Sequence, residues 1–277
     1  MIIYFLGDIG MYNDNLKELL INIKSKINNE DIMVLLGDNF YDCGVESKND
    51  KKWDKFLEFF TFNNTIYSIL GNHDYQSNPI AQIQYKKNNW TMPNFYYYLG
   101  FNNDTQIWFL DTCQLVTMGY CEEDNYHGHV TKNKLKRKLN ENFENLKKTQ
   151  LKWLDESLKN SPCKNKIVVG HYPIITNGYH KGKDTDDLYE LLIPIFKKYK
   201  IMLYISGHDH NSQYNTELME DYTFRQLIIG NSSKLSDDFE SNNFFYNKSC
   251  CYASLNLNNF DLRIEDKNEI IKIIKFI

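Results

Sequence analysis

The chain lacks the features of three large classes of protein: membrane-spanning, nucleic-acid-binding and zinc–thiolate proteins. No apolar run in its 277 residues approaches the ~20 residues that a membrane-spanning helix requires. Lysine and arginine are spread along the sequence and the net charge is −4, so there is no electrostatic case for nucleic acid as the main partner. None of the six cysteines stands in a CxxC pair, which argues against a zinc–thiolate site.

The amino terminus also lacks the marks of a signal peptide, namely a basic start, a long apolar stretch and a small-residue cleavage site. The apolar run that begins the chain leads at once into Gly7 and Asp8, which is typical of a first strand. We therefore expect an intracellular, cytoplasmic protein. In that setting Cys113 and Cys121 are expected as free thiols, although a disulfide between them stays open.

One pattern occurs five times in the sequence. An apolar run ends in glycine, and the next residue is aspartate, asparagine or histidine. Each run indicates a buried strand with a polar side chain at its carboxyl end. The five strand-end residues are Asp8, Asp38, Asn72, His171 and His208. Because the carboxyl ends of parallel strands meet at one edge of a sheet, these residues are expected to form a single site.

The rest of the sequence predicts an α/β fold. Helical periodicity covers residues 14–28, 51–60, 138–159 and 186–199, and residues 95–111 read as a hairpin around Asn102. Strands are expected at 226–229, 252–257, 262–264 and 270–274, whereas 79–93 and 113–139 read as irregular. With no linker, repeat or boundary, we expect one domain over 1–277, built from two mixed β-sheets packed face to face with helices on the outside.

The donor atoms near the strand ends are oxygen and nitrogen, without sulfur. They belong to Asp8, Asp38, Tyr41, Asn72, His171, His208 and His210. This mixture suits Fe(III), Fe(II), Zn or Mn. Seven donors are too many for one such ion, but two ions that share Asp38 would each have four protein ligands. Two ions about 3.5–4 Å apart can hold the attacking and leaving oxygens of a displacement at phosphorus.

Five motifs in this order resemble those of the calcineurin-like metallophosphoesterases, and more narrowly the small, tartrate-resistant purple acid phosphatases. They are Gly7-Asp8-x-Gly10, Gly37-Asp38-x-x-Tyr41, Gly71-Asn72-His73-Asp74, Val168-Val-Gly-His171 and Gly207-His208-x-His210. The resemblance covers about residues 2–215. It implies a four-layer sandwich with two metal ions. Fe(III) would be held by Asp8, Asp38, Tyr41 and His210, and Fe(II), Zn or Mn by Asp38, Asn72, His171 and His208.

The resemblance also implies roles for three further residues. His73 would contact the substrate phosphate, Asp74 would orient the His73 ring, and His180 would lie near the leaving group. The implied activity is hydrolysis of phosphate monoesters, with a metal-bound hydroxide attacking phosphorus. The substrate would be a phosphorylated small molecule, nucleotide or phosphoprotein, and the protein a monomer without nucleic-acid or membrane partners.

Two alternatives stay open at this point. One is a phosphodiesterase or nucleotide pyrophosphatase of the same fold, and the other is a non-catalytic metal-binding scaffold. Of the remaining polar residues, His127 and His129 are expected to be ordinary loop residues, and the lysine-rich run 132–148 a solvated helix face. The tyrosines at 96–98 are expected in a sheet and its core, not in a base-stacking platform.

Overall fold

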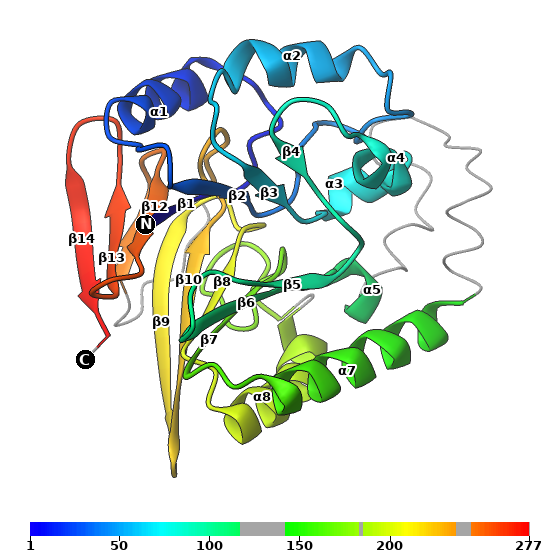
Figure 1. Ribbon diagram of the computed structural model, residues 1–277, viewed down its shortest axis with the longest axis vertical. Coiled ribbons are helices and arrows are strands. Elements are labelled where there is room, and N and C mark those ends of the chain that lie inside the picture. Colours follow the sequence, from blue (N-terminus) through cyan, green and yellow to red (C-terminus); the bar gives the residue numbers. More distant parts are fainter. Residues whose placement is uncertain (117–141, 183–184, 237–244, 277) are drawn as a thin grey trace.

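The computed structural model describes residues 1–116, 142–182, 185–236 and 245–276. Within these ranges there are two seven-stranded sheets, ordered β14-β13-β12-β1-β2-β3-β4 and β11-β9-β10-β8-β7-β6-β5. Figure 1 shows α1 and α2 on one side of the sheets and α7 and α8 on the other. The predicted sandwich of two mixed sheets with helices outside is therefore confirmed.

The strands of the first sheet are β1 (Ile2–Leu6), β2 (Ile32–Leu35), β3 (Ile66–Ser68), β4 (Trp90–Thr91), β12 (Tyr252–Asn256), β13 (Asp261–Glu265) and β14 (Ile270–Lys275). Those of the second are β5 (Tyr97–Gly100), β6 (Thr105–Phe109), β7 (Asn165–Val169), β8 (Leu203–Ser206), β9 (Ser212–Met219), β10 (Tyr222–Ile229) and β11 (Phe245–Asn247). The described helices are α1 (Asp14–Lys24), α2 (Lys52–Phe59), α3 (Asn72–Tyr75), α4 (Pro79–Gln84), α5 (Cys113–Val116), α7 (Phe143–Asn160) and α8 (Thr185–Tyr199).

Apolar residues fill both faces of the central strands. In β1, Ile3 and Phe5 belong to a core that also contains Phe109 of the other sheet. The alternate residues Tyr4 and Leu6 belong to the core that includes the buried residues of α1. Successive side chains of a strand point to opposite faces, so one strand contributes to both cores. This two-sided burial explains why the strands read as continuous apolar runs.

Helix α1 is shorter than the periodicity predicts. It begins at the cap residue Asn13, whose side chain accepts a hydrogen bond from Leu16 N, and it ends at Lys24 instead of near residue 28. The buried Asp31 carboxylate accepts hydrogen bonds from Asn28 N at 2.8 Å and Ile2 N at 2.6 Å. These bonds fix the chain after α1 in a turn that leads into β2.

Residues 79–93 were expected to be irregular, and this expectation was wrong. They contain α4 and β4, and Pro79 occupies the first turn of α4, where proline is favoured. Tyr85 stacks on Trp53 with ring centroids 3.6 Å apart, and Trp90 Nε1 donates to Gln82 O. A six-residue helix is too short to show a period, so only its tertiary contacts reveal it.

Strands β9 and β11 are absent from the sequence-based expectations. Strand β9 alternates weakly because three of its polar residues, Ser212, Gln213 and Asn215, are buried. Gln213 Oε1 accepts a hydrogen bond from Asn177 N at 3.1 Å, and Asn215 Nδ2 donates to Ile175 O at 3.0 Å.

The predicted hairpin of β5 and β6 is confirmed, and Tyr97 stacks on Phe109 inside the core as expected. Among the described residues, no helix combines the length and apolar composition of a membrane span.

Candidate metal centre

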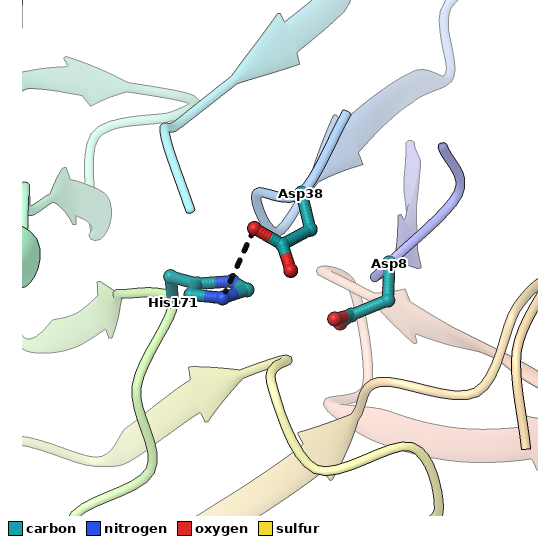
Figure 2. Close-up of side chains that lie close together, drawn as sticks. All are labelled: Asp8, Asp38 and His171. Carbon is teal, nitrogen blue, oxygen red and sulfur yellow. Dashed lines mark ion pairs between the residues drawn. The ribbon is translucent and has the colours of Figure 1, made fainter. Parts of the chain in front are cut away.

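The polar residues that follow the central strands meet at one edge of the fold. Strands β1, β2 and β3 are parallel, and so are β6, β7, β8 and β10. Ligand atoms of Asp8, Asp38 and His171 lie within 4.8 Å of one another. Figure 2 shows these three side chains pointing toward one another. Strand ends from both sheets therefore converge on one buried group of acidic and imidazole side chains.

The backbone at this edge is held in uncommon conformations. Asp8, Asp38 and His208 have φ values of 57°, 51° and 69°, in the left-handed region that side chains other than glycine seldom occupy. Each such residue costs roughly 1–3 kcal/mol and persists only where its surroundings fix it. Only glycine fits at position 71, before the strand-end residue Asn72, because a Cβ there would collide with the Asp38 carboxylate.

Tyr41 connects three of the predicted ligands. Its hydroxyl lies 3.0 Å from Asp8 Oδ1, 3.1 Å from Asp38 Oδ2 and 3.2 Å from His210 Nε2. His210 Nε2 is in turn 3.4 Å from Asp8 Oδ1. Burial and the two carboxylates hold the pKa of Tyr41 well above its ordinary value, so the metal-free phenol donates its proton to them. Tyr41 is thus in contact with the other three donors predicted for the first ion.

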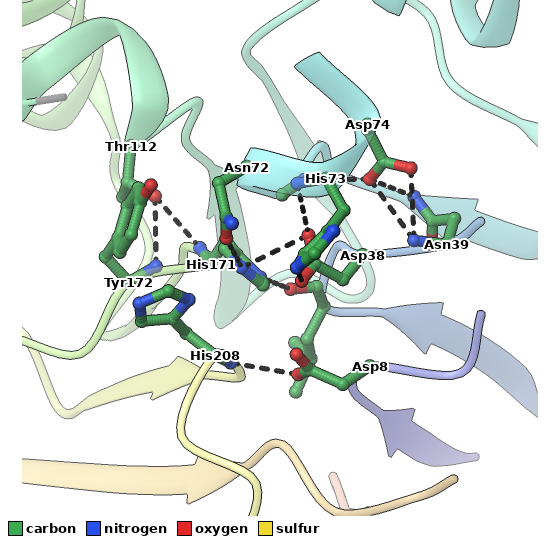
Figure 3. Close-up of polar contacts among 12 residues, drawn as sticks. Asp8, Asp38, Asn39, Asn72, His73, Asp74, Thr112, His171, Tyr172 and His208 are labelled. Carbon is green, nitrogen blue, oxygen red and sulfur yellow. Dashed lines mark hydrogen bonds and ion pairs between the residues drawn. The ribbon is translucent and has the colours of Figure 1, made fainter. Parts of the chain in front are cut away.

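His171 faces the second group of donors. Its Nδ1 lies 2.8 Å from Leu36 O, which fixes Nδ1 as the protonated nitrogen of the neutral ring and leaves Nε2 as an acceptor. Nε2 lies 3.1 Å from Asn72 Oδ1 and 3.5 Å from Asp38 Oδ1 (Figure 3). Three electron-pair donors that face one another are stabilised by a cation among them. The backbone carbonyl that orients the ring is a common device of metal-binding histidines.

His208 reaches this group through its backbone and its ring. Its backbone N donates to Asp8 Oδ2 at 2.9 Å. Its ring packs against His171, Tyr172 and His180, with centroid separations of 5.0, 4.4 and 3.7 Å. Figure 3 shows the ring on the Tyr172 side of the centre. His180 is thereby also brought to the site, and its backbone N donates to Asp209 Oδ1 at 3.3 Å.

His73 and Asp74 have different surroundings from those implied by the resemblance. His73 Nδ1 lies 2.6 Å from Asp42 O, and its ring packs edge-on against Tyr41. The Asp74 carboxylate is fully buried and accepts hydrogen bonds from Gly71 N, Asn39 N and Gln82 Nε2. The contact that orients the His73 ring is therefore Asp42 O, whereas Asp74 joins the loops after β2 and β3.

The electrostatics of the group favour cation binding. Burial raises the pKa of Asp8 to about 7, although His171 opposes the shift. Burial also acts to raise the pKa of Asp38, but His171 and His73 outweigh it and the pKa is lowered. Burial lowers the pKa of His210 to about 4, and the charge of Lys234 adds to this effect. The lowered pKa keeps the His210 ring neutral, which is the protonation state that a metal-binding imidazole requires.

The donor set therefore fits two metal ions. The side chains offer carboxylate, phenol, amide and imidazole groups, which suit Fe, Zn and Mn. Asp38 lies between the two groups of donors, with Oδ2 toward Tyr41 and Oδ1 toward His171. A cleft of about 830 Å³ opens beside Tyr41 and is lined by residues between 41 and 52 and by Ser77.

Sequence reasoning overlooked Lys234. This residue follows the run Ile228-Ile229-Gly230-Asn231, which repeats the pattern of the five predicted strand ends. Strand β10 is parallel to β8, so its carboxyl end opens to the same edge as His208. Lys234 Nζ lies 5.1 Å from the centroid of the Tyr41 ring. The same pattern search, extended beyond residue 215, would have found this segment.

Asp111, at the end of β6, lies in a second buried polar group. Tyr75 donates a short hydrogen bond to Asp111 Oδ2, and Gln114 Nε2 donates to the Tyr75 hydroxyl at 3.0 Å. Gln150 of α7 pairs with the backbone of Asp111 through bonds of 2.9 and 3.0 Å. This group joins α3, which carries Asn72 and His73, to α5 and α7. Burial raises the pKa of Asp111 from 3.8 to about 7.

We expect Asp111→Asn to change the pH dependence of stability. Because the pKa of Asp111 is raised to about 7 in the folded state, the folded protein binds a proton that the unfolded chain releases near pH 3.8. Its contribution to the free energy of unfolding is thus lost as pH rises through that interval, by a few kcal/mol. Denaturant unfolding should show a decline toward neutral pH that Asp111→Asn makes shallower. Equal slopes for both proteins would contradict the proposed burial effect.

Several sequence-based expectations lie outside the described residues. His127 and His129 do, as does Cys121, so the disulfide and free-thiol alternatives for Cys113 stay predictions. The predicted loop 113–139 is described only for residues 113–116, which form α5. Of the lysine-rich run 132–148, only the residues from 142 onward are described, where Lys148 is exposed and Lys147 is half-buried.

Known proteins with similar sequences are phosphatases. The family model of calcineurin-like phosphoesterases matches residues 1–212. Tartrate-resistant acid phosphatase type 5 of Rattus norvegicus is 34% identical over 212 residues, which cover 72% of this chain and 60% of the rat protein. Purple acid phosphatase 17 of Arabidopsis thaliana is 32% identical over 243 residues, or 83% of this chain and 67% of the plant protein.

Solved structures support the same fold. The Plasmodium protein described as "GAP50 the anchor in the inner membrane complex" superposes with a TM-score of 0.78 at 23% identity, covering 99% of this chain and 88% of that one. Purple acid phosphatase PPD1 from yellow lupin seeds superposes with a TM-score of 0.64 at 12% identity, covering 99% and 52% of the two chains. With its strand-end residues gathered at the edge where two such sheets meet, the chain belongs to the calcineurin-like phosphoesterase family.

Proposed function

We propose that this protein is a dinuclear-metal hydrolase of phosphate monoesters, of the acid phosphatase type. The position of Asp38 is the main support, because its two carboxylate oxygens face different groups of donors. The matched segment spans 60% of the rat phosphatase and 67% of the plant one, and both are named for acid phosphatase activity. A carboxylate shared by two cations is the arrangement expected of a two-metal site for phosphoryl chemistry.

The ligand sets that we propose follow the two groups of contacts. Asp8, Asp38, Tyr41 and His210 would hold Fe(III), since phenolate and carboxylate are hard donors that favour the trivalent ion. Asp38, Asn72, His171 and His208 would hold Fe(II), Zn or Mn. The first set is supported by the contacts of the Tyr41 hydroxyl, and the second by the contacts of His171 Nε2 and the packing of the His208 ring.

Two ions held by these residues would supply Lewis-acid polarisation of the phosphate and of a water molecule. The side chains of His73 and His180 would then donate a proton and position the ester. His73 Nδ1 is held by Asp42 O, so a second proton would reside on Nε2, near the centre and 3.9 Å from Asp38 Oδ2. From there it can be transferred to the leaving oxygen. His180, stacked on His208, would stabilise negative charge on the other side.

A comparison of esters tests this function. The metal-loaded protein should hydrolyse p-nitrophenyl phosphate faster than bis(p-nitrophenyl) phosphate, with an optimum at acidic pH. Faster hydrolysis of the diester would instead support the phosphodiesterase or nucleotide pyrophosphatase alternative. Two bound metals without turnover on either ester would support the scaffold alternative, for which the similarity to an anchor protein is a reason to test.

The proposed Tyr41 ligand has a visible consequence. A phenolate bound to Fe(III) should give the iron-loaded, oxidised protein a purple to pink absorption band. Tyr41→Phe removes one oxygen atom from a side chain that contacts Asp8, Asp38 and His210, so we expect it to remove the band while most of the centre persists. The measurement is a visible spectrum after mild oxidation, together with the iron content.

Tyr12→Phe is the matched control for the colour. Tyr12 is nearby, but its hydroxyl donates to Asn39 O at 2.9 Å and contacts no predicted ligand side chain. The band should therefore persist in this variant. A colourless oxidised wild type with full iron content would show that Tyr41 is not a ligand, and the acidic pH optimum would lose its basis.

We further propose that residues 1–277 form one domain. This is supported by the topology, because β1 pairs with β2 on one side and with β12 on the other, so both ends of the chain share a sheet. The substrate is proposed to be a phosphorylated small molecule, nucleotide or phosphoprotein. The monomeric state, the cytoplasmic location and the absence of nucleic-acid and membrane partners stay predictions.

A further inference from the structure

Lys234 is a cationic side chain at the edge of the candidate metal centre. Its Nζ lies 5.1 Å from the centroid of the Tyr41 ring, a cation–π distance. The hydroxyl end of the same ring faces Asp8 and Asp38. The ammonium group therefore lies beside the predicted metal positions and is separate from the donors that would hold the ions.

The backbone on both sides of Lys234 is fixed to the centre. Ser233 Oγ donates a short hydrogen bond to the carbonyl of Asp8, and Asn13 Nδ2 donates to Ser233 O at 2.7 Å. Ser236 N donates to the carbonyl of His210 at 3.0 Å. Asp8 and His210, which would bind the first ion, thus also hold the backbone of the segment that carries Lys234.

Lys234 forms no ion pair with a carboxylate in the described structure, and its contact is with the ring of Tyr41. Among residues 1–116, 142–182, 185–236 and 245–276, no carboxylate lies within ion-pair distance of its Nζ, although other lysines form such pairs. The next residue along the chain, Leu235, is apolar and 48% exposed. The half-buried Lys234 therefore has a charge that is available to an anionic ligand.

We propose that Lys234 binds a second anionic group of the substrate, adjacent to the phosphate held at the metal centre. Lys234 would then determine specificity, because a simple monoester occupies the metals alone whereas a substrate with two neighbouring anionic groups occupies both positions. This proposal rests on the proposed phosphatase function, but binding can test it without turnover. It assigns a positioning role to a residue outside the five strand-end motifs.

The test compares pyrophosphate and phosphoglycolate with orthophosphate, by calorimetric titration of the metal-loaded protein. Lys234→Met retains the length of the side chain and removes its charge. We expect it to weaken pyrophosphate binding by about 10- to 100-fold, the usual contribution of a hydrogen bond to a charged group, and to change orthophosphate binding much less. Weakened phosphoglycolate binding would identify a carboxylate as a second acceptable group, and unchanged phosphoglycolate binding would restrict the position to phosphate.

Two further variants control this experiment. Lys234→Arg should restore the preference for pyrophosphate, because the charge is kept. Lys87→Met, at an exposed lysine before β4, should leave all three affinities unchanged. Equal weakening of pyrophosphate and orthophosphate, or loss of metal in Lys234→Met, would overturn the proposal. If the wild type binds the anions as expected but hydrolyses no ester, the proposed function fails and the role of Lys234 in binding stands.

Discussion

Asp38→Asn is expected to lower both the metal content and the turnover of the protein. Asp38 Oδ1 lies 3.5 Å from His171 Nε2 and accepts a hydrogen bond from His73 N at 2.9 Å, while Oδ2 accepts from Tyr41. Asparagine has nearly the same shape but no charge and one acceptor oxygen fewer. Loss of a residue that only supports a metal ligand costs about 10- to 100-fold in affinity, so loss of the shared ligand should cost at least that much.

Asp31→Asn is the matched control for this variant. Asp31 is as buried as Asp38, with 2% and 1% exposure, and it too accepts backbone hydrogen bonds, but it lies at the start of β2. Its replacement should reduce stability and leave the metal content unchanged. The test of the shared-ligand role is metal analysis of both purified variants, together with their turnover of p-nitrophenyl phosphate. Two tightly bound ions and near wild-type turnover in Asp38→Asn would refute the shared-ligand assignment.

His73→Ala is expected to keep the metal and lose turnover, by roughly 10²- to 10⁴-fold, as is typical of acid–base groups. The truncation removes the imidazole that contacts Asp42 O and packs against Tyr41. It leaves intact the backbone N–H that binds Asp38 Oδ1. The geometry of the shared carboxylate is therefore preserved, whereas the proton donor is lost. The comparison requires turnover and metal content from the same preparation.

The pH profile separates a proton-transfer role from a structural one. If His73 supplies a proton, the alanine variant should lose the decline in rate on the alkaline side of the optimum and should recover most on esters whose leaving group needs no protonation. A uniform loss of rate for all esters at every pH would point to a structural role. Loss of metal would make His73 a ligand and overturn the role proposed here.

The general fold and most of the site could be predicted from local sequence patterns. A strand buried on both faces must be apolar throughout, so its end is visible where the apolar run stops. At Gly71 the glycine is required because the Asp38 carboxylate occupies the space of a Cβ. Chain order and the parallel arrangement then place Asp8, Asp38 and Asn72 at one edge. These constraints are local, which is why they can be recognised in a single sequence.

Short elements and polar strands could not be predicted in this way. Helix α4 has only six residues. Tyr85, which follows it, stacks on Trp53 of α2 and so fixes the end of the helix. In β9 the buried Gln213 and Asn215 are polar because they bind the loop of residues 175–177. Their hydrogen-bond partners are distant in sequence, so a pattern of apolar residues cannot reveal their burial.

The sequence by itself determined that Asp8, Asp38, Asn72, His171 and His208 lie at one edge of the fold, because each follows the end of a buried strand. Only the tertiary structure decided how these side chains are oriented and what surrounds them. In the structure, hydrogen bonds of the Asp74 carboxylate connect two loops, and the carbonyl of Asp42 orients the His73 ring. The Lys234 side chain packs against the Tyr41 ring. The physical reason is that a strand end fixes the position of a residue, whereas the direction of its side chain depends on partners that distant segments supply.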